Sequence, residues 1–122
     1  MPEEMVGIGF GYLVQLILYL SEKLEIVLPY KMKFCGSHST IHSLNFPLYY
    51  EDHSLKELGF GVKLFNLNIS YLCFTQGILL KEEELSQNIF NVYRCLDSSS
   101  FGRFFFFFFS FIPFQLIFKQ IN

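Results

Sequence analysis

The stretch Gly36-Ser-His-Ser-Thr-Ile-His-Ser-Leu-Asn-Phe-Pro-Leu-Tyr-Tyr50 decides how this chain folds. Its first four residues are polar and led by glycine, which predicts a turn. Thr40-Ile41 then predicts a short strand, and Phe46 to Tyr50 predicts another short extended segment. Pro47 has no N–H to donate to a strand ladder, so this segment should lie at a sheet edge.

Residues 26–34, immediately upstream, predict the first strand of the same sheet. Pro29 places the beginning of that strand at an edge or a bulge. Beyond it, side chains alternate with a period of two, which puts apolar and charged residues on opposite faces. The alternating positions are Tyr30, Met32 and Phe34 on one face, and Lys31 and Lys33 on the other.

Downstream, residues 58–75 predict a helix. Leu58 to Phe74 is a run of seventeen residues with no turn signal after Gly61, which is too long for a typical strand. We expect this helix to end near Gly77. A second helix is predicted over 81–96, with three glutamates in its first turn, where a helix dipole favours negative charge. Its expected buried face comprises Leu85, Ile89, Val92 and Leu96.

Residues 3–25 also predict a helix, opened by Pro2 and two glutamates. Apolar residues occur nearly all round it, which favours deep burial. Its apolar run from Met5 to Leu20 is shorter than the roughly 20 residues of a membrane span, so we expect a core helix instead. Its three glycines, Gly7, Gly9 and Gly11, cannot be a dinucleotide loop because no strand precedes them, and close packing against a neighbour explains them better.

The composition limits the kinds of partner that this chain can have. The chain has 122 residues, enough for one domain, and 52% of them are hydrophobic. Such an excess of apolar surface on a short chain indicates a protein partner, a membrane or a truncated domain. The net charge is −2 and no block of Lys or Arg occurs, so we expect no nucleic-acid partner.

Residues that could carry chemistry are few. Cys35, Cys73 and Cys95 are widely spaced, and no CxxC pair occurs, so neither a zinc ribbon nor a redox site is predicted. His38 and His42 stand four residues apart, but in a Gly- and Ser-rich segment rather than on a helix. We expect no catalytic residue, no metal, no cofactor and no small-molecule substrate. A small enzyme using Cys35 or His38 is the least favoured alternative.

The tail from Asp97 differs in kind from the preceding chain. Six consecutive phenylalanines serve neither helical nor strand periodicity. They are Phe104, Phe105, Phe106, Phe107, Phe108 and Phe109. Translation of a T-rich intron would give such a run, so we interpret residues 97–122 as a tail foreign to the domain at 1–96. The alternative is a small membrane-associated protein in which these residues contact the bilayer, although Pro113 and a length of about fifteen residues argue against a regular span.

Together, residues 7–75 resemble the C-terminal domain of the UV radiation resistance-associated protein family, which includes Barkor-type subunits. Five short signals coincide in order and spacing over about seventy residues. The matching family-motif residues are Gly11, Tyr12, Pro29, Tyr30, Gly36, Ser37, Ser39, Ile41, Phe46, Pro47, Leu48, Tyr49, Leu64, Asn66 and Asn68. The family's long coiled coil would precede the domain, whereas Met1 here stands within its first helix. After about Tyr71 the match fades.

The resemblance implies a partial β–α autophagy-specific (BARA-like) domain of mixed α/β (α+β) class, with a small sheet of short strands covered by apolar helices. It also implies a non-catalytic regulatory and scaffold subunit of the class III phosphatidylinositol 3-kinase complex. Such a subunit would act in autophagy and endosomal trafficking, pair with a Beclin-type subunit, and contact a membrane surface. It would be cytoplasmic and peripheral to endosomal and autophagic membranes.

Overall fold

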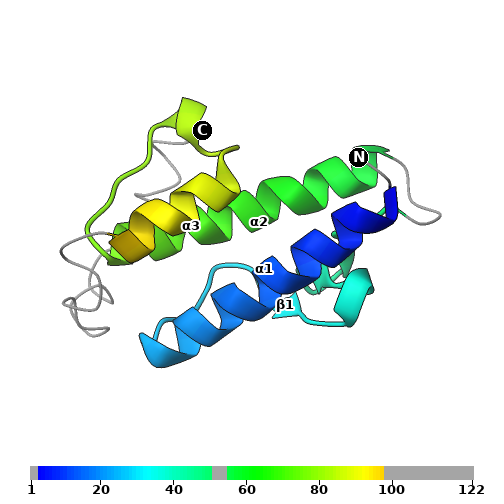
Figure 1. Cartoon of the computed structure of the whole chain (residues 1–122), viewed down its shortest axis with the longest axis horizontal. Coiled ribbons are helices and arrows are strands. Elements are labelled where there is room, and N and C mark those ends of the chain that lie inside the picture. Colours follow the sequence, from blue (N-terminus) through cyan, green and yellow to red (C-terminus); the bar gives the residue numbers. More distant parts are fainter. Residues whose placement is uncertain (1–2, 51–54, 98–122) are drawn as a thin grey trace.

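In the computed structural model, which describes residues 3–50 and 55–97, the chain forms three α-helices and a small antiparallel sheet. The elements are, in chain order, α1 (Glu3–Lys23), β1 (Met32–Lys33), η1 (Gly36–His38), β2 (Thr40–Ile41), β3 (Phe46–Pro47), α2 (Leu55–Thr75), η2 (Glu82–Glu84) and α3 (Asn88–Asp97). The predicted mixed α/β class, with short strands and apolar helices, is confirmed. Figure 1 shows α1 and α2 as two long neighbouring helices, with η1 beside the N-terminal half of α1.

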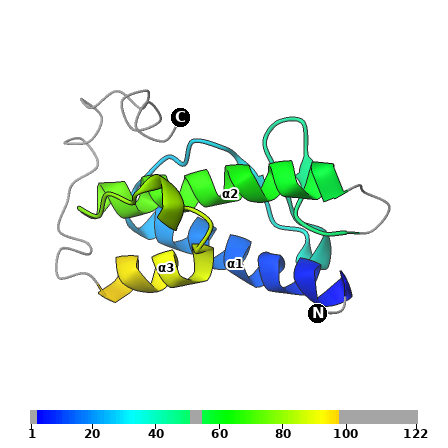
Figure 2. The ribbon, with the colours of Figure 1, turned by 90° about the horizontal axis from the view of Figure 1, so that it is seen from above.

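The sheet has the order β1-β2-β3, with Met32 opposite Ile41 and Thr40 opposite Pro47. Pro47 therefore lies in an edge strand, as predicted. The two long helices cover different parts of this region. Helix α1 packs on η1 and β1, whereas α2 packs on β2 and β3. Figure 2, seen from above, shows α3 beside the C-terminal half of α2, away from the sheet.

The first predicted strand was too long, because only Met32–Lys33 is a strand. The N–H and C=O of Tyr30 both bond the side chain of Asn68 rather than a strand. The alternation holds at Met32, which is buried, but Phe34 is exposed. The segment expected to extend to Tyr50 likewise forms a strand only at Phe46–Pro47.

The helix predicted over 58–75 is confirmed as α2, which begins three residues earlier. It ends in a Schellman motif, in which the N–H of Ile78 bonds the carbonyl of Cys73 and that of Gly77 bonds Phe74. Gly77 has a φ of 87°, as this motif requires. Helix α1 ends in the same motif around Glu25, whose φ is 55° although it is not glycine.

The helix predicted over 81–96 is in fact two elements, η2 and α3. Its expected buried face was also wrong in part. Val92 is buried, but Ile89 is 67% exposed and Leu96 is 42% exposed. Because α3 begins only at Asn88, its contact with α2 is set by Asn91, Val92 and Cys95, which are the buried residues of the helix.

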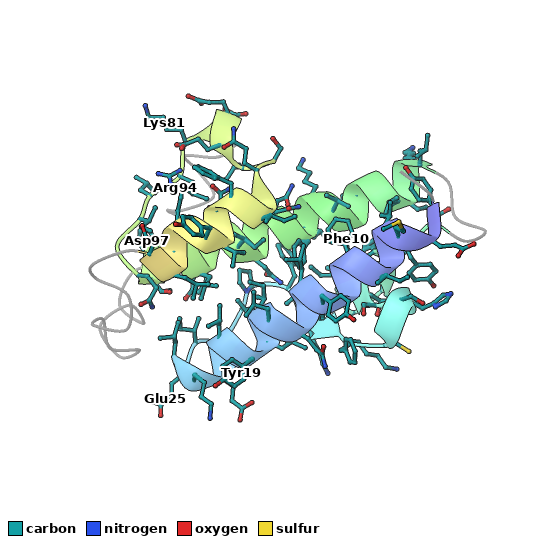
Figure 3. All side chains as sticks on the ribbon, in the orientation of Figure 1. Phe10, Tyr19, Glu25, Lys81, Arg94 and Asp97 are labelled. Atoms are coloured by element: carbon teal, nitrogen blue, oxygen red, sulfur yellow. The ribbon has the colours of Figure 1, made fainter. Side chains whose placement is uncertain are left out.

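The core runs between α1 and α2 and continues under α3. Its fully buried members include Val14 and Ile17 of α1, Ile41 of β2, and Phe65 and Leu72 of α2. Burying such a side chain contributes about 1.5–3 kcal/mol each, so this cluster is the main source of stability. Figure 3 shows Phe10 between the two long helices, where its ring meets that of Phe65 edge-on at 5.4 Å.

Candidate functional site: the outward face of α1

The prediction that α1 is buried all round was wrong. One face packs in the core, but another presents apolar side chains to solvent. Met5, Ile8, Tyr12 and Tyr19 are between 48% and 71% exposed. With Gln15, these residues are spaced alternately three and four positions apart, so they form one stripe along the helix. In Figure 3, Tyr19 points to the side of α1 away from α2.

By length and composition, Glu4–Lys23 of α1 is also the one helix in the described part of the chain that could cross a membrane. Core helices of soluble proteins meet the same criteria, and here Val14, Ile17 and Leu20 pack into the core. The outward stripe is thus an amphipathic feature of a helix that is already packed on one side.

A groove runs beside this stripe, bounded by α1 and the loop that contains η1. It consists of two adjoining hollows, of about 440 and 250 Å³, which share Ile8 and Ser37. The larger is lined by Glu4, Gly7, Ile8, Ser37, His38, Tyr49 and Tyr50. The smaller is lined by Ile8, Gly11, Tyr12, Gln15, Phe34, Gly36 and Ser37. We call this surface, together with the stripe, the α1 groove.

Glycines bring the walls of the groove together. A Cβ at Gly7 would overlap the carbonyl oxygen of Ser37, and one at Gly11 would overlap that of Gly36. The prediction that α1's glycines permit close packing is confirmed at these two positions, whereas Gly9 faces open space. Likewise, Gly61 of α2 admits the carbonyl of Pro47. Glycines therefore allow α1 to lie close to the η1 loop and α2 to lie close to β3.

Hydrogen bonds fix the η1 loop at the groove rim. The buried hydroxyl of Ser39 accepts from the N–H of Cys35 at 3.1 Å and donates to the carbonyl of Gly36 at 3.1 Å. Gly36 has a φ of 56°, in the region that favours glycine. The ring centroids of His38 and Tyr49 lie 4.7 Å apart, and both residues line the larger hollow.

The structure brings most of the family-motif residues together in three contacts. Gly11, Gly36, Ser37 and Ser39 make the packing of α1 on η1. Pro47 and Leu48 meet α2 at Gly61. Asn68 of α2 holds Tyr30.

The remaining motif residues lie in the core or in smaller contacts. Ile41, Leu48 and Leu64 are core residues, and Asn66 accepts a hydrogen bond from Asn88. Pro29 is half-buried, and Phe46 packs its ring on Phe60. Five residues of this set line the hollows of the groove: Gly11, Tyr12, Gly36, Ser37 and Tyr49.

The residues considered for chemistry do not converge. Cys35 is exposed, and the Oγ of Ser37 lies 3.0 Å from Nδ1 of the adjacent, exposed His38. His42 instead accepts from the N–H of Leu44 at 3.2 Å and packs on Phe46. Within residues 3–50 and 55–97, no three His, Cys, Asp or Glu side chains gather as a metal site would require. Phe104 to Phe109 lie outside the described residues.

Sequence reasoning missed the outward face of α1, because apolar residues on all sides of a helix give no sign of which side packs. The three–four spacing of Met5, Ile8, Tyr12 and Tyr19 was the signal that could have found it. An apolar helical stripe beside an aromatic groove is typical of surfaces that dock a partner.

Comparison with known families agrees with this class. Residues 3–77 match the family described as Vacuolar protein sorting 38, and because this is more than half of the chain, the protein belongs to that family. It is a family of regulatory, not catalytic, subunits of the class III phosphatidylinositol 3-kinase complex, with a role in vacuolar and endosomal sorting. No curated protein and no solved structure matches the chain. The matched region ends at Gly77, which caps α2, so η2 and α3 lie beyond it.

Proposed function

We propose that this chain is a non-catalytic scaffold element of the class III phosphatidylinositol 3-kinase complex in autophagy and endosomal trafficking, similar to the UV radiation resistance-associated subunits. Its α1 groove would dock a helix of a Beclin-type subunit. The observation that carries this proposal is the stripe of Met5, Ile8, Tyr12 and Tyr19, which lies exposed within the family-matched region.

The geometry of the groove favours a helix as the docked element. Side chains spaced alternately three and four positions apart lie on one face of a helix. Such a face packs against a partner helix that runs alongside it. Exposed tyrosines beside apolar hollows are typical anchors of protein interfaces. The backbone-to-helix contacts at Gly7 and Gly11 hold the two walls of the groove at a fixed spacing, which limits the conformational cost of binding.

The test is co-purification of the full chain with a Beclin-type subunit, followed by titration of two matched variants. Tyr12 and Leu44 are both 71% exposed, but only Tyr12 lines the groove. Tyr12→Glu should weaken binding by at least about tenfold, because a charge would be buried in an apolar interface. Leu44→Glu should leave binding unchanged. Equal affinities for the two variants would place the interface elsewhere.

Failure of the whole chain to bind, in an assay in which a full-length relative does bind, would argue against this function for the chain in its present form. The domain boundary proposed at residue 97 has its own test, which is whether an intron boundary lies near codon 97 of the transcript. A boundary there would identify residues 97–122 as a tail foreign to the domain.

The second candidate is direct membrane attachment, favoured by the phenylalanine run in the sequence. In this case the full chain should float with liposomes, and deletion of residues 101–122 should abolish flotation. Attachment through the complex alone predicts that flotation requires the Beclin-type subunit and survives this deletion. The two outcomes separate a peripheral subunit from a tail-anchored protein.

A further inference from the structure

We propose that Cys73 of α2 and Cys95 of α3 are a paired thiol site that closes to a reversible disulfide when the protein meets a peroxide. Nothing in the proposed docking function depends on this pair, which lies on α2 and α3 and does not line the α1 groove.

The geometry places the Cys73 sulfur beside the turn of α3 that carries Cys95. The Sγ of Cys73 lies 3.4 Å from the backbone carbonyl oxygen of Asn91. In an α-helix the carbonyl of residue 91 faces the N–H of residue 95, so Cys73 projects onto the helical turn that carries Cys95. Cys73 and Cys95 are both fully buried, and they belong to the same apolar cluster.

The environment gives the two sulfurs different roles. The hydrogen bond with Cys95 and burial raise the pKa of the Cys73 thiol. The same hydrogen bond, accepted by the other sulfur, lowers the pKa of Cys95. Cys95 is therefore the sulfur that attacks first, since the thiolate is the nucleophile, and Cys73 is the resolving thiol.

The reaction balances with a peroxide as the oxidant. The Cys95 thiolate attacks one peroxide oxygen, the O–O bond breaks, and protonation gives a sulfenic acid and one molecule of water. Cys73 sulfur then attacks the Cys95 sulfur, the S–O bond breaks, and a second water leaves with the thiol proton. Two thiols lose two electrons, and one peroxide gains them. A thiol reductant reverses the step by exchange.

Access to these buried thiols depends on α3. This helix has only ten residues, and its Asn91 side-chain oxygen is buried without a hydrogen-bond partner among the described residues. An unsatisfied buried oxygen disfavours the packed state, so α3 should open locally more often than α1 or α2. A disulfide formed in such an opening would fasten α3 to α2.

The experiment treats the full chain with hydrogen peroxide, blocks the remaining thiols with an alkylating reagent in denaturant, and maps the products after trypsin. The expected result is a fall from three free thiols to one, with Cys35 alone alkylated. The linked product should join the peptide Leu64–Lys81 to the peptide Cys95–Arg103. Added dithiothreitol should restore all three thiols.

Two controls make the outcome decisive. The double variant C95A/L96C moves the thiol by one position onto an exposed part of α3, with almost the same sequence separation from Cys73. It should lose the linkage. The unmodified chain oxidised in denaturant shows the pairing set by sequence alone. Three thiols left free in the native chain, linkage through Cys35, or equal linkage in the variant or in denaturant would each overturn the proposal.

Discussion

Asn68 holds the backbone of Tyr30 with both ends of its side-chain amide. Its Oδ1 accepts from the N–H of Tyr30 at 2.9 Å, and its Nδ2 donates to the carbonyl of Tyr30 at 2.8 Å. The two residues are 38 positions apart, and Asn68 is fully buried. This pair of bonds takes the place of a strand partner for the segment that leads into β1.

Asn68→Ala should therefore destabilise the fold, because it leaves both polar groups of Tyr30 without their partner. We expect a loss on the order of 2–4 kcal/mol in the free energy of unfolding. Urea denaturation followed by far-UV circular dichroism measures it. Asn66→Ala, which removes a single bond to half-buried Asn88, is the matched control and should cost about 1 kcal/mol. Equal losses would show that the contact with Tyr30 is not a special constraint.

Two glycines of α1 should respond to alanine with opposite signs. Gly11→Ala should destabilise by about 1–3 kcal/mol, because its Cβ would overlap the backbone carbonyl of Gly36. Gly9→Ala meets nothing and should stabilise by about 0.5–1 kcal/mol through helix propensity. Thermal unfolding of the two variants side by side checks the signs. Destabilisation by both would mean that flexibility of α1, and not its packing on η1, is the requirement.

The two Schellman motifs offer a second matched pair. Glu25→Gly should stabilise by about 1 kcal/mol, because Glu25 holds a left-handed conformation that glycine adopts without strain. Gly77→Ala, at the equivalent position after α2, should destabilise by about 1 kcal/mol. Chemical denaturation is again the measurement. A neutral Glu25→Gly would indicate that its side chain makes a compensating contribution.

Acid should loosen the η2–α3 region through Glu84. The N–H of Lys81 and the guanidinium of Arg94 bond its carboxylate and lower its pKa. Because the folded state lowers this pKa, the carboxylate contributes stability at pH values above its unfolded pKa. That contribution is lost as the pH falls through the lower, folded value.

A series of urea midpoints between neutral and acidic pH measures this effect. Glu84→Gln should lower the midpoint at neutral pH and flatten its decline in acid. Glu83→Gln, at the exposed neighbouring position, should leave the profile close to that of the unmodified chain. Identical profiles for the two variants would remove Glu84 from the explanation.

The sequence predicted the elements better than it predicted their extents. Helix α2 and its end at Gly77 followed from periodicity and length, since seventeen residues of apolar recurrence have no alternative in a small sheet. Strand β1 was overestimated because an alternating pattern does not reveal that Asn68, far along the chain, takes the polar groups of Tyr30. The buried face of α3 was misjudged because a helix start at Asn88 depends on the η2 turn.

What the sequence determined by itself is the class of the molecule: a small α/β piece with more apolar surface than it can bury, and a motif series typical of a complex subunit. Only the tertiary structure decided which apolar side chains remain outside. A helix that is apolar all round can pack only one side against the core. Gly7 and Gly11 determine which side of α1 faces the η1 loop, because the absence of a Cβ lets the loop backbone contact the helix there. The stripe from Met5 to Tyr19 is left on the outside because no local pattern, but only close backbone packing, fixed the orientation of α1.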